Sequence, residues 1–106
     1  DGIVAGNTTR SREGITSISK EKIEAIGNGG MSGAPLHKKN LELVKYVHTR
    51  SEGKLPIIGV GGIMTPGQAN AMLDAGASLV EIYTGLVYEG PALIKNIIKY
   101  LETAGK

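Results

Sequence analysis

Cysteine, tryptophan and phenylalanine are absent from the 106 residues of this chain, and tyrosine occurs four times. Without cysteine the chain can form neither a disulfide framework nor a thiolate metal site, which fits a reducing compartment. A hydrophobic core would have to consist of leucine, isoleucine, valine, alanine and methionine. The two histidines, His37 and His48, show no metal-ligand spacing, so we predict no metal site and expect both at the surface.

Long apolar runs, a strong charge and an initiator methionine are also lacking. No run approaches the roughly 20 residues of a membrane-spanning helix, and the N-terminus does not resemble a signal peptide. The formal net charge is +2 with both signs interspersed, which argues against a nucleic-acid partner. The length suits one small domain but not a (β/α)8 barrel of roughly 250 residues. Residues 1–6 resemble a strand already under way, which suggests a piece of a longer protein.

Glycine is abundant, with 16 of 106 residues against an average share of roughly 7%. The most informative segments are residues 57–63 and 76–85, where two apolar runs each end in glycine or a small hydroxyl residue. Two such strand ends side by side offer backbone N–H groups to an anion, and helix N-termini favour negative charge. In (β/α)8 barrels the loops after the last two strands frequently bind phosphate. The sequence therefore predicts a phosphate site.

Apolar runs and helical patterns alternate along the chain. We predict strands over 2–6, 55–60 and 78–83, and helices over 36–50, from Pro66 to Gly76, and from Pro91 onward after a short helix. Residues 7–36 are expected to form a long loop of a functional kind, since such loops are uncommon in compact domains. Alternating strands and helices indicate parallel βα units. We therefore expect an α/β fold, with residues 1–106 forming about three βα units of a (β/α)8 TIM barrel.

Each motif has an alternative interpretation. Gly59-Val60-Gly61-Gly62 lacks the last glycine of a dinucleotide-binding fingerprint, because Met64 occupies that place. The glycines could serve only to turn the chain. Asn7-Thr8-Thr9 could bind a ligand with carbonyl, amide or carboxylate groups, or could form a capped turn. Gly29-Gly30-Met31-Ser32-Gly33 is either a loop of close approach or a flexible connection. We find no catalytic residue set and no evident general base.

Four segments in order carry a resemblance to a known family. They are Asn7-Thr8-Thr9, Ser32-Gly33-x-Pro35-Leu36, residues 56–63 and residues 75–84. Together they resemble dihydroorotate dehydrogenase over the whole chain, as the C-terminal part of that enzyme with the last three strands of its barrel. The pair Tyr83-Thr84 resembles the quinone-dependent, membrane-associated class 2 more than the soluble class 1 enzymes.

The resemblance implies specific roles. The substrate dihydroorotate would be held by Asn7 and Thr8. Binding of the cofactor FMN would fall to Ser32, Gly33, Gly61, Gly62, Tyr83 and Thr84, the last four at its phosphate. Such an enzyme oxidises dihydroorotate to orotate in de novo pyrimidine biosynthesis and passes the electrons to quinone. A hydride moves from substrate C6 to flavin N5 while a base removes a proton from C5.

The resemblance also implies missing parts. Several parts of the family's enzymes would lie upstream of Asp1: the catalytic serine, a flavin-contacting lysine, further asparagines, and the helices that meet membrane and quinone. The complete enzyme of the bacterial type would lie at the cytoplasmic face of the inner membrane. We therefore expect the 106 residues alone to be inactive. Two alternatives stay open: another phosphate-binding barrel, such as an inosine monophosphate dehydrogenase-like or phosphoribosyl isomerase protein, or a non-binding remnant that self-associates through unpaired strand edges and an uncovered sheet face.

Overall fold

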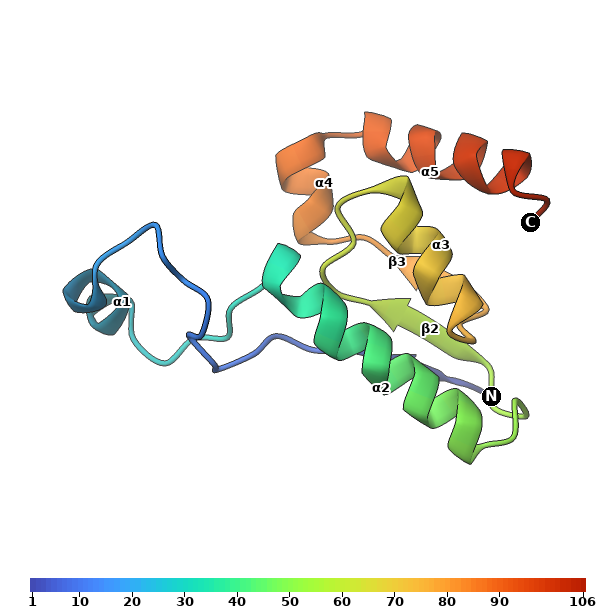
Figure 1. Ribbon diagram of the computed structural model, residues 1–106, viewed down its shortest axis with the longest axis horizontal. Helices are drawn as coiled ribbons and strands as arrows, with labels where there is room; N and C mark the ends of the chain where they lie inside the picture. The colour runs from blue at the N-terminus through green and yellow to red at the C-terminus, as the bar shows by residue number, and fades with distance from the viewer.

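The computed structural model describes all residues from Asp1 to Lys106. Its sheet is parallel, in the order β1-β2-β3, and consists of β1 (Ile3–Ala5), β2 (Ile57–Val60) and β3 (Leu79–Glu81). The helical segments are α1 (Lys20–Ile26), η1 (Ala34–Leu36, a 3-10 turn), α2 (His37–Arg50), α3 (Pro66–Asp74), α4 (Thr84–Glu89) and α5 (Ala92–Thr103). Figure 1 shows α2 and α3 over one face of the sheet, with α5 beside α3. The predicted parallel α/β architecture is confirmed, with strands shorter than expected.

Helix α3 forms where the sequence predicts it. The Thr65 side chain accepts a hydrogen bond from the Gln68 N–H, while Gln68 reaches back to the Thr65 N–H, and Pro66 stands at the first helical position. At the other end Gly76 has a φ of 119°, and the N–H groups of Gly76 and Ala77 donate to carbonyls of the last turn. This pattern is a Schellman motif, which requires a residue that tolerates the left-handed region.

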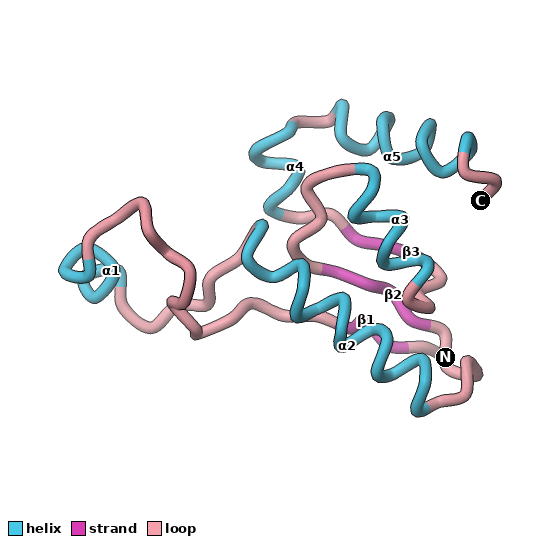
Figure 2. The backbone as a smooth tube through the Cα atoms, in the orientation of Figure 1, coloured by secondary structure: helices cyan, strands magenta, loops and turns pink.

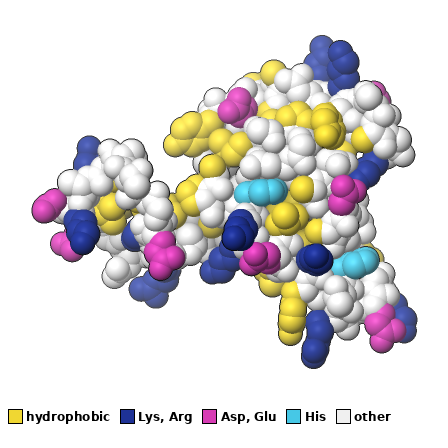
Figure 3. All heavy atoms as spheres, viewed as in Figure 1, with side chains coloured by type: hydrophobic (Ala, Val, Ile, Leu, Met, Phe, Trp, Pro, Cys, Tyr) yellow, Lys and Arg dark blue, Asp and Glu magenta, His cyan; other side chains and the backbone are white.

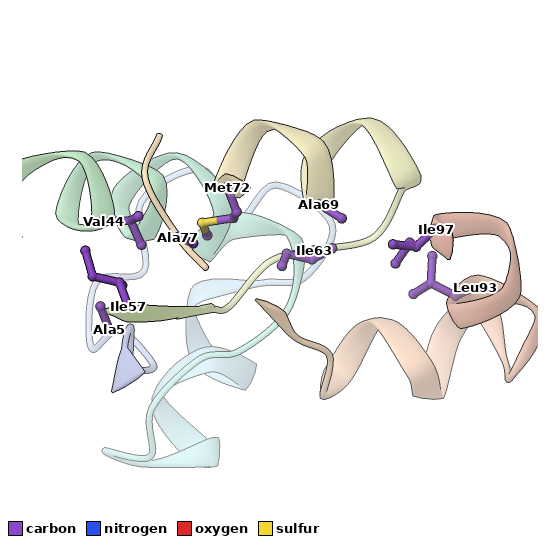
Figure 4. Packing of buried hydrophobic residues seen from close by; sticks show 9 residues of the cluster. All are labelled: Ala5, Val44, Ile57, Ile63, Ala69, Met72, Ala77, Leu93 and Ile97. Carbon is purple, nitrogen blue, oxygen red and sulfur yellow. The ribbon is translucent and has the colours of Figure 1, made fainter. Parts of the chain in front are cut away.

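The core lies between the sheet and the helices. Its nine buried residues are Ala5, Val44, Ile57, Ile63, Ala69, Met72, Ala77, Leu93 and Ile97 (Figure 4). Within β2, Ile57 and Gly59 face this core, whereas Ile58 and Val60 are half-buried on the opposite face. On that opposite face Leu79 is 62% exposed. A short apolar run such as 55–60 is typical of a strand covered on both faces, but here helices cover one face only.

Residues 7–36 differ most from expectation, because they contain α1. Ser19 caps this helix by accepting a hydrogen bond from the Lys22 N–H. Residues 10–30, here called the arm, project from the body of the molecule (Figure 2). An antiparallel bridge between Thr9 and Met31 closes the arm at its root, and Arg12 donates to the Gly29 carbonyl at 2.5 Å. Since α1 buries no residue, it leaves no apolar stripe in the sequence.

One further expectation needs correction. Both histidines are half-buried rather than at the surface, with the His48 ring lying against Gly76. In α5 the residues that reach the core are Leu93 and Ile97, while Ile94 and Ile98 remain exposed. The latter two belong to an apolar groove between α5 and β3. The face seen in Figure 3 shows basic side chains scattered among acidic ones, without a continuous basic patch.

Candidate functional site

A cleft at the carboxyl ends of the three strands brings the predicted site residues together. It has a volume of about 200 Å³ and is lined by 14 residues. All of the predicted substrate and cofactor residues are among them: Asn7, Thr8, Ser32, Gly33, Gly61, Gly62, Tyr83 and Thr84. They meet because parallel strands end at the same edge of the sheet, which is where ligands bind in such folds.

The end of β1 contributes Asn7 and Thr8, both exposed to solvent. The Oδ1 atom of Asn7 accepts a hydrogen bond from the N–H of the neighbouring Thr8 at 2.8 Å. The Asn7 side-chain amide nitrogen donates no hydrogen bond within the chain, so it remains available to a ligand. The backbone carbonyl of Asn7 accepts from Nδ2 of Asn40 at 3.3 Å.

Asn40 does not line the cleft but supports two residues that do, and the sequence reasoning missed it. It is only 2% exposed, and its amide lies where a side chain on Gly61 would have to be. The residue therefore joins the end of β1 to the loop after β2. Its signal in the sequence was a polar residue on the apolar face of α2, four residues from both Leu36 and Val44.

The loop after β2 turns through Gly61 and Gly62, whose φ angles are 107° and 73°. A methyl group at Gly62 would overlap the backbone of His37, and one at Gly61 would overlap the Asn40 amide. The glycines are thus needed for the turn and for the packing of α2, as the alternative interpretation holds. The Gly62 N–H nevertheless donates no hydrogen bond within the chain, so it is free to meet a ligand.

His37 is the first residue of α2 and lies behind this loop. Its Nδ1 atom is buried without a hydrogen-bond partner. Desolvation by burial lowers the pKa of His37 below its usual value, because removal from water disfavours the charged imidazolium. Burial therefore favours the neutral form of the ring over the imidazolium.

The loop after β3 leads directly into α4. Thr84 begins this helix, and its Oγ1 donates to Oγ of Ser32 at 2.9 Å. Gly33 is buried with a φ of 88°, and a methyl group on it would lie 3.2 Å from Cγ2 of Thr84. The first N–H groups of a helix have no partner within it, and the preceding residue, Tyr83, supplies no side-chain cap. Barrel phosphate sites frequently combine two such loops with a short extra helix, the position that α4 occupies.

The charge distribution limits what the cleft can hold. None of its lining residues is Lys, Arg or His, and its one carboxylate is Glu81. Glu81 takes part in neither of the ion pairs in the structure. No group of three His, Cys, Asp or Glu side chains is arranged to hold a metal ion. Binding of an anion here would depend on backbone N–H groups and on the hydroxyl groups of Thr8, Ser32 and Thr84.

Comparison with known proteins identifies the family. The sequence profile described as dihydroorotate dehydrogenase matches residues 1–104. "Dihydroorotate dehydrogenase (quinone)" from Christiangramia forsetii is 51% identical over 96 residues, covering 91% of this chain and 27% of the relative. The protein of the same name from Salinispora arenicola is 49% identical over 94 residues, covering 89% of this chain and 27% of its own length. The family match decides against the inosine monophosphate dehydrogenase-like and phosphoribosyl isomerase alternatives.

Comparison with solved structures leads to the same family. The dihydroorotate dehydrogenase of Eimeria tenella in complex with ferulenol superposes with a TM-score of 0.84 at 34% identity, covering 99% of this chain and 28% of that chain. The likeness confirms the predicted partial (β/α)8 barrel. The chain thus spans somewhat more than a quarter of the length of these relatives. None of its helices is both long and apolar enough to cross a bilayer.

Proposed function

This chain belongs to the dihydroorotate dehydrogenase family, and we propose that it supplies the FMN phosphate site and part of the dihydroorotate site of a quinone-dependent enzyme. One observation carries the proposal. Residues that are distant in sequence, from Asn7 to Thr84, line a single cleft at the carboxyl edge of the sheet. We further propose that the complete enzyme oxidises dihydroorotate to orotate in pyrimidine biosynthesis at the cytoplasmic face of the inner membrane. The names of the relatives support dihydroorotate as the substrate and quinone as the electron acceptor.

The loops after β2 and β3 are the proposed phosphate site. The free N–H of Gly62 and the first N–H groups of α4 supply donors. The Thr84 hydroxyl adds one more when its proton turns from Oγ of Ser32 to the ligand. The close packing of α2 behind Gly61 and Gly62 fixes this loop before a ligand arrives. Such preorganised donors suit a phosphate, because no side chain has to be ordered on binding.

The remaining polar residues of the cleft are proposed to hold the substrate and the flavin. The Asn7 amide nitrogen and the Thr8 hydroxyl can donate to the carbonyl and carboxylate oxygens of a pyrimidine acid. Ser32 and Gly33 would lie along the flavin, whose bound ring supplies the redox chemistry. The cleft side chains of this chain hold and orient the ligands but include no general base, so we expect no dehydrogenase turnover from the 106 residues alone.

Binding of FMN to the chain tests the proposal. The cleft volume of about 200 Å³ is below the roughly 300–1,000 Å³ of pockets that enclose small ligands, so we expect millimolar affinity. FMN titrated into isotope-labelled protein should shift the NMR signals of Gly62 and Thr84. Riboflavin, which lacks the phosphate, should bind at least tenfold more weakly.

A matched pair of variants locates the binding. Thr84→Val removes the cleft hydroxyl and should weaken FMN binding about fivefold to tenfold, which corresponds to roughly 1 kcal/mol for one hydrogen bond. Thr103→Val removes an exposed hydroxyl on α5 that bonds the Lys99 carbonyl, and should leave FMN binding unchanged. Absence of any FMN binding at millimolar concentration would contradict the proposal and favour the self-associating remnant.

A further inference from the structure

Glu81 is the only carboxylate among the residues that line the cleft, and no Lys, Arg or His accompanies it. The residues before and after it, Val80 in β3 and Ile82 just past the strand, both pack against the core on the helix side of the sheet. Because side chains alternate along a strand, Glu81 faces the opposite side. It is exposed there and has no ion-pair partner in the chain. A lone carboxylate in a proposed phosphate-binding cleft requires an explanation.

The strand register places Glu81 at one definite level. It lies opposite Val60, and Gly61 and Gly62 follow directly after Val60. Glu81 is therefore level with the residue that precedes the glycine loop, one position farther from the carboxyl edge of the sheet than Gly61. It comes three residues before Thr84 in the chain. Three residues span at most about 10 Å, which is comparable to the length of the ribityl chain that separates the phosphate of FMN from its ring.

Charge then determines the orientation of a ligand. An ionised carboxylate only accepts hydrogen bonds, and it repels a phosphate in its vicinity. The phosphate is therefore favoured at Gly62 and Thr84, and the part of the ligand next to it must bring donors to Glu81. A chain of hydroxyl groups satisfies this requirement, whereas a second anionic group does not.

We propose that Glu81 accepts hydrogen bonds from the ribityl hydroxyl groups of FMN and so fixes the direction in which the cofactor lies in the cleft. This inference rests on the proposed function, since it presupposes that the phosphate binds at the two loops. It adds a cofactor-binding side chain to a site whose other polar side chains are hydroxyl groups and one amide.

The test measures two ligands by NMR titration of the 106-residue chain: FMN, and phenyl phosphate as a phosphate monoester without hydroxyl groups. Glu81→Ala should weaken FMN binding about tenfold to a hundredfold, as expected for hydrogen bonds to a charged group. Phenyl phosphate should bind as well as before or more tightly, because repulsion has been removed. Glu81→Gln should show a smaller loss for FMN, since its amide oxygen still accepts.

Glu102→Ala, which removes an exposed carboxylate from α5, is the control and should change neither affinity. Because Glu81 is exposed, we expect its variants to fold. The NMR spectrum of each variant, compared with that of the unsubstituted chain, checks this. Unchanged FMN affinity in Glu81→Ala, or an equal loss for both ligands, would overturn the inference while leaving the phosphate site intact. Failure of the unsubstituted chain to bind either ligand would overturn the phosphate site and the inference together.

Discussion

The side-chain amide of Asn40 donates a hydrogen bond to the backbone carbonyl of Asn7 over 3.3 Å, and so ties α2 to the end of β1. Asn40→Ala should lower the free energy of unfolding by about 1–3 kcal/mol, because it leaves a polar group without its partner. Asn96→Ala, at an exposed position on α5, is the control and should cost less than about 0.5 kcal/mol. Urea denaturation measures both, and equal effects would show that the Asn40 bond does not stabilise the fold.

Gly62 and Gly90 have nearly the same φ, 73° and 75°, but different surroundings. A methyl group at Gly62 would overlap the His37 backbone, whereas one at Gly90 would meet no atom within 4 Å. Gly90→Ala should therefore cost about 1–2 kcal/mol for the left-handed conformation alone. Gly62→Ala should cost distinctly more in the same denaturation experiment. Comparable losses would mean that the loop after β2 can move away from α2.

His37 should make stability depend on pH. Burial lowers its pKa in the folded chain relative to the unfolded one, so the unfolded state binds the proton more readily. The contribution to stability is therefore complete above about pH 6.5, the ordinary value, and is lost as the pH falls through the folded-state pKa. Denaturation between pH 7.5 and 5 should show this decline, and His37→Gln should reduce it. An unaltered decline in His37→Gln would exclude this histidine as its source.

The open face of the sheet should drive self-association. Val4 and Leu79 are 51% and 62% exposed there, and both outer strands have an unpaired edge. Apolar faces and free edges of this kind promote association. We expect a dimer or larger species by light scattering, shifted toward monomer by Leu79→Glu. Ile26→Glu, which places the same charge on the arm, should not shift it. A monomeric mass for the unsubstituted chain would contradict this expectation.

Much of the fold could be predicted because local signals agree with the tertiary arrangement. The capping box at Thr65 and the closing Gly76 define α3 without reference to any other element. Helix α1 could not be recognised, because a helix that buries nothing carries no periodic apolar pattern. Strand ends were overextended by one or two residues, since apolar side chains continue past the last ladder hydrogen bond.

Some residues of the candidate site could likewise be predicted from the sequence, and others could not. Gly61-Gly62 and Tyr83-Thr84 are predictable as neighbours, because parallel strands terminate at one edge. Ser32 lies far from any strand, and its place beside Thr84 could be anticipated only from the family resemblance. Asn40 escaped attention because its partners, the Asn7 carbonyl and the Gly61 backbone, are set by tertiary packing.

The bridge between Thr9 and Met31 marks the boundary between the arm and the body of the molecule. Because the chain leaves and re-enters the body at paired positions, we expect changes in the length or sequence of the arm to leave Asn7 and Ser32 in place. The arm is therefore a suitable insertion point for protein engineering, where a reporter or an affinity tag could replace residues 10–30.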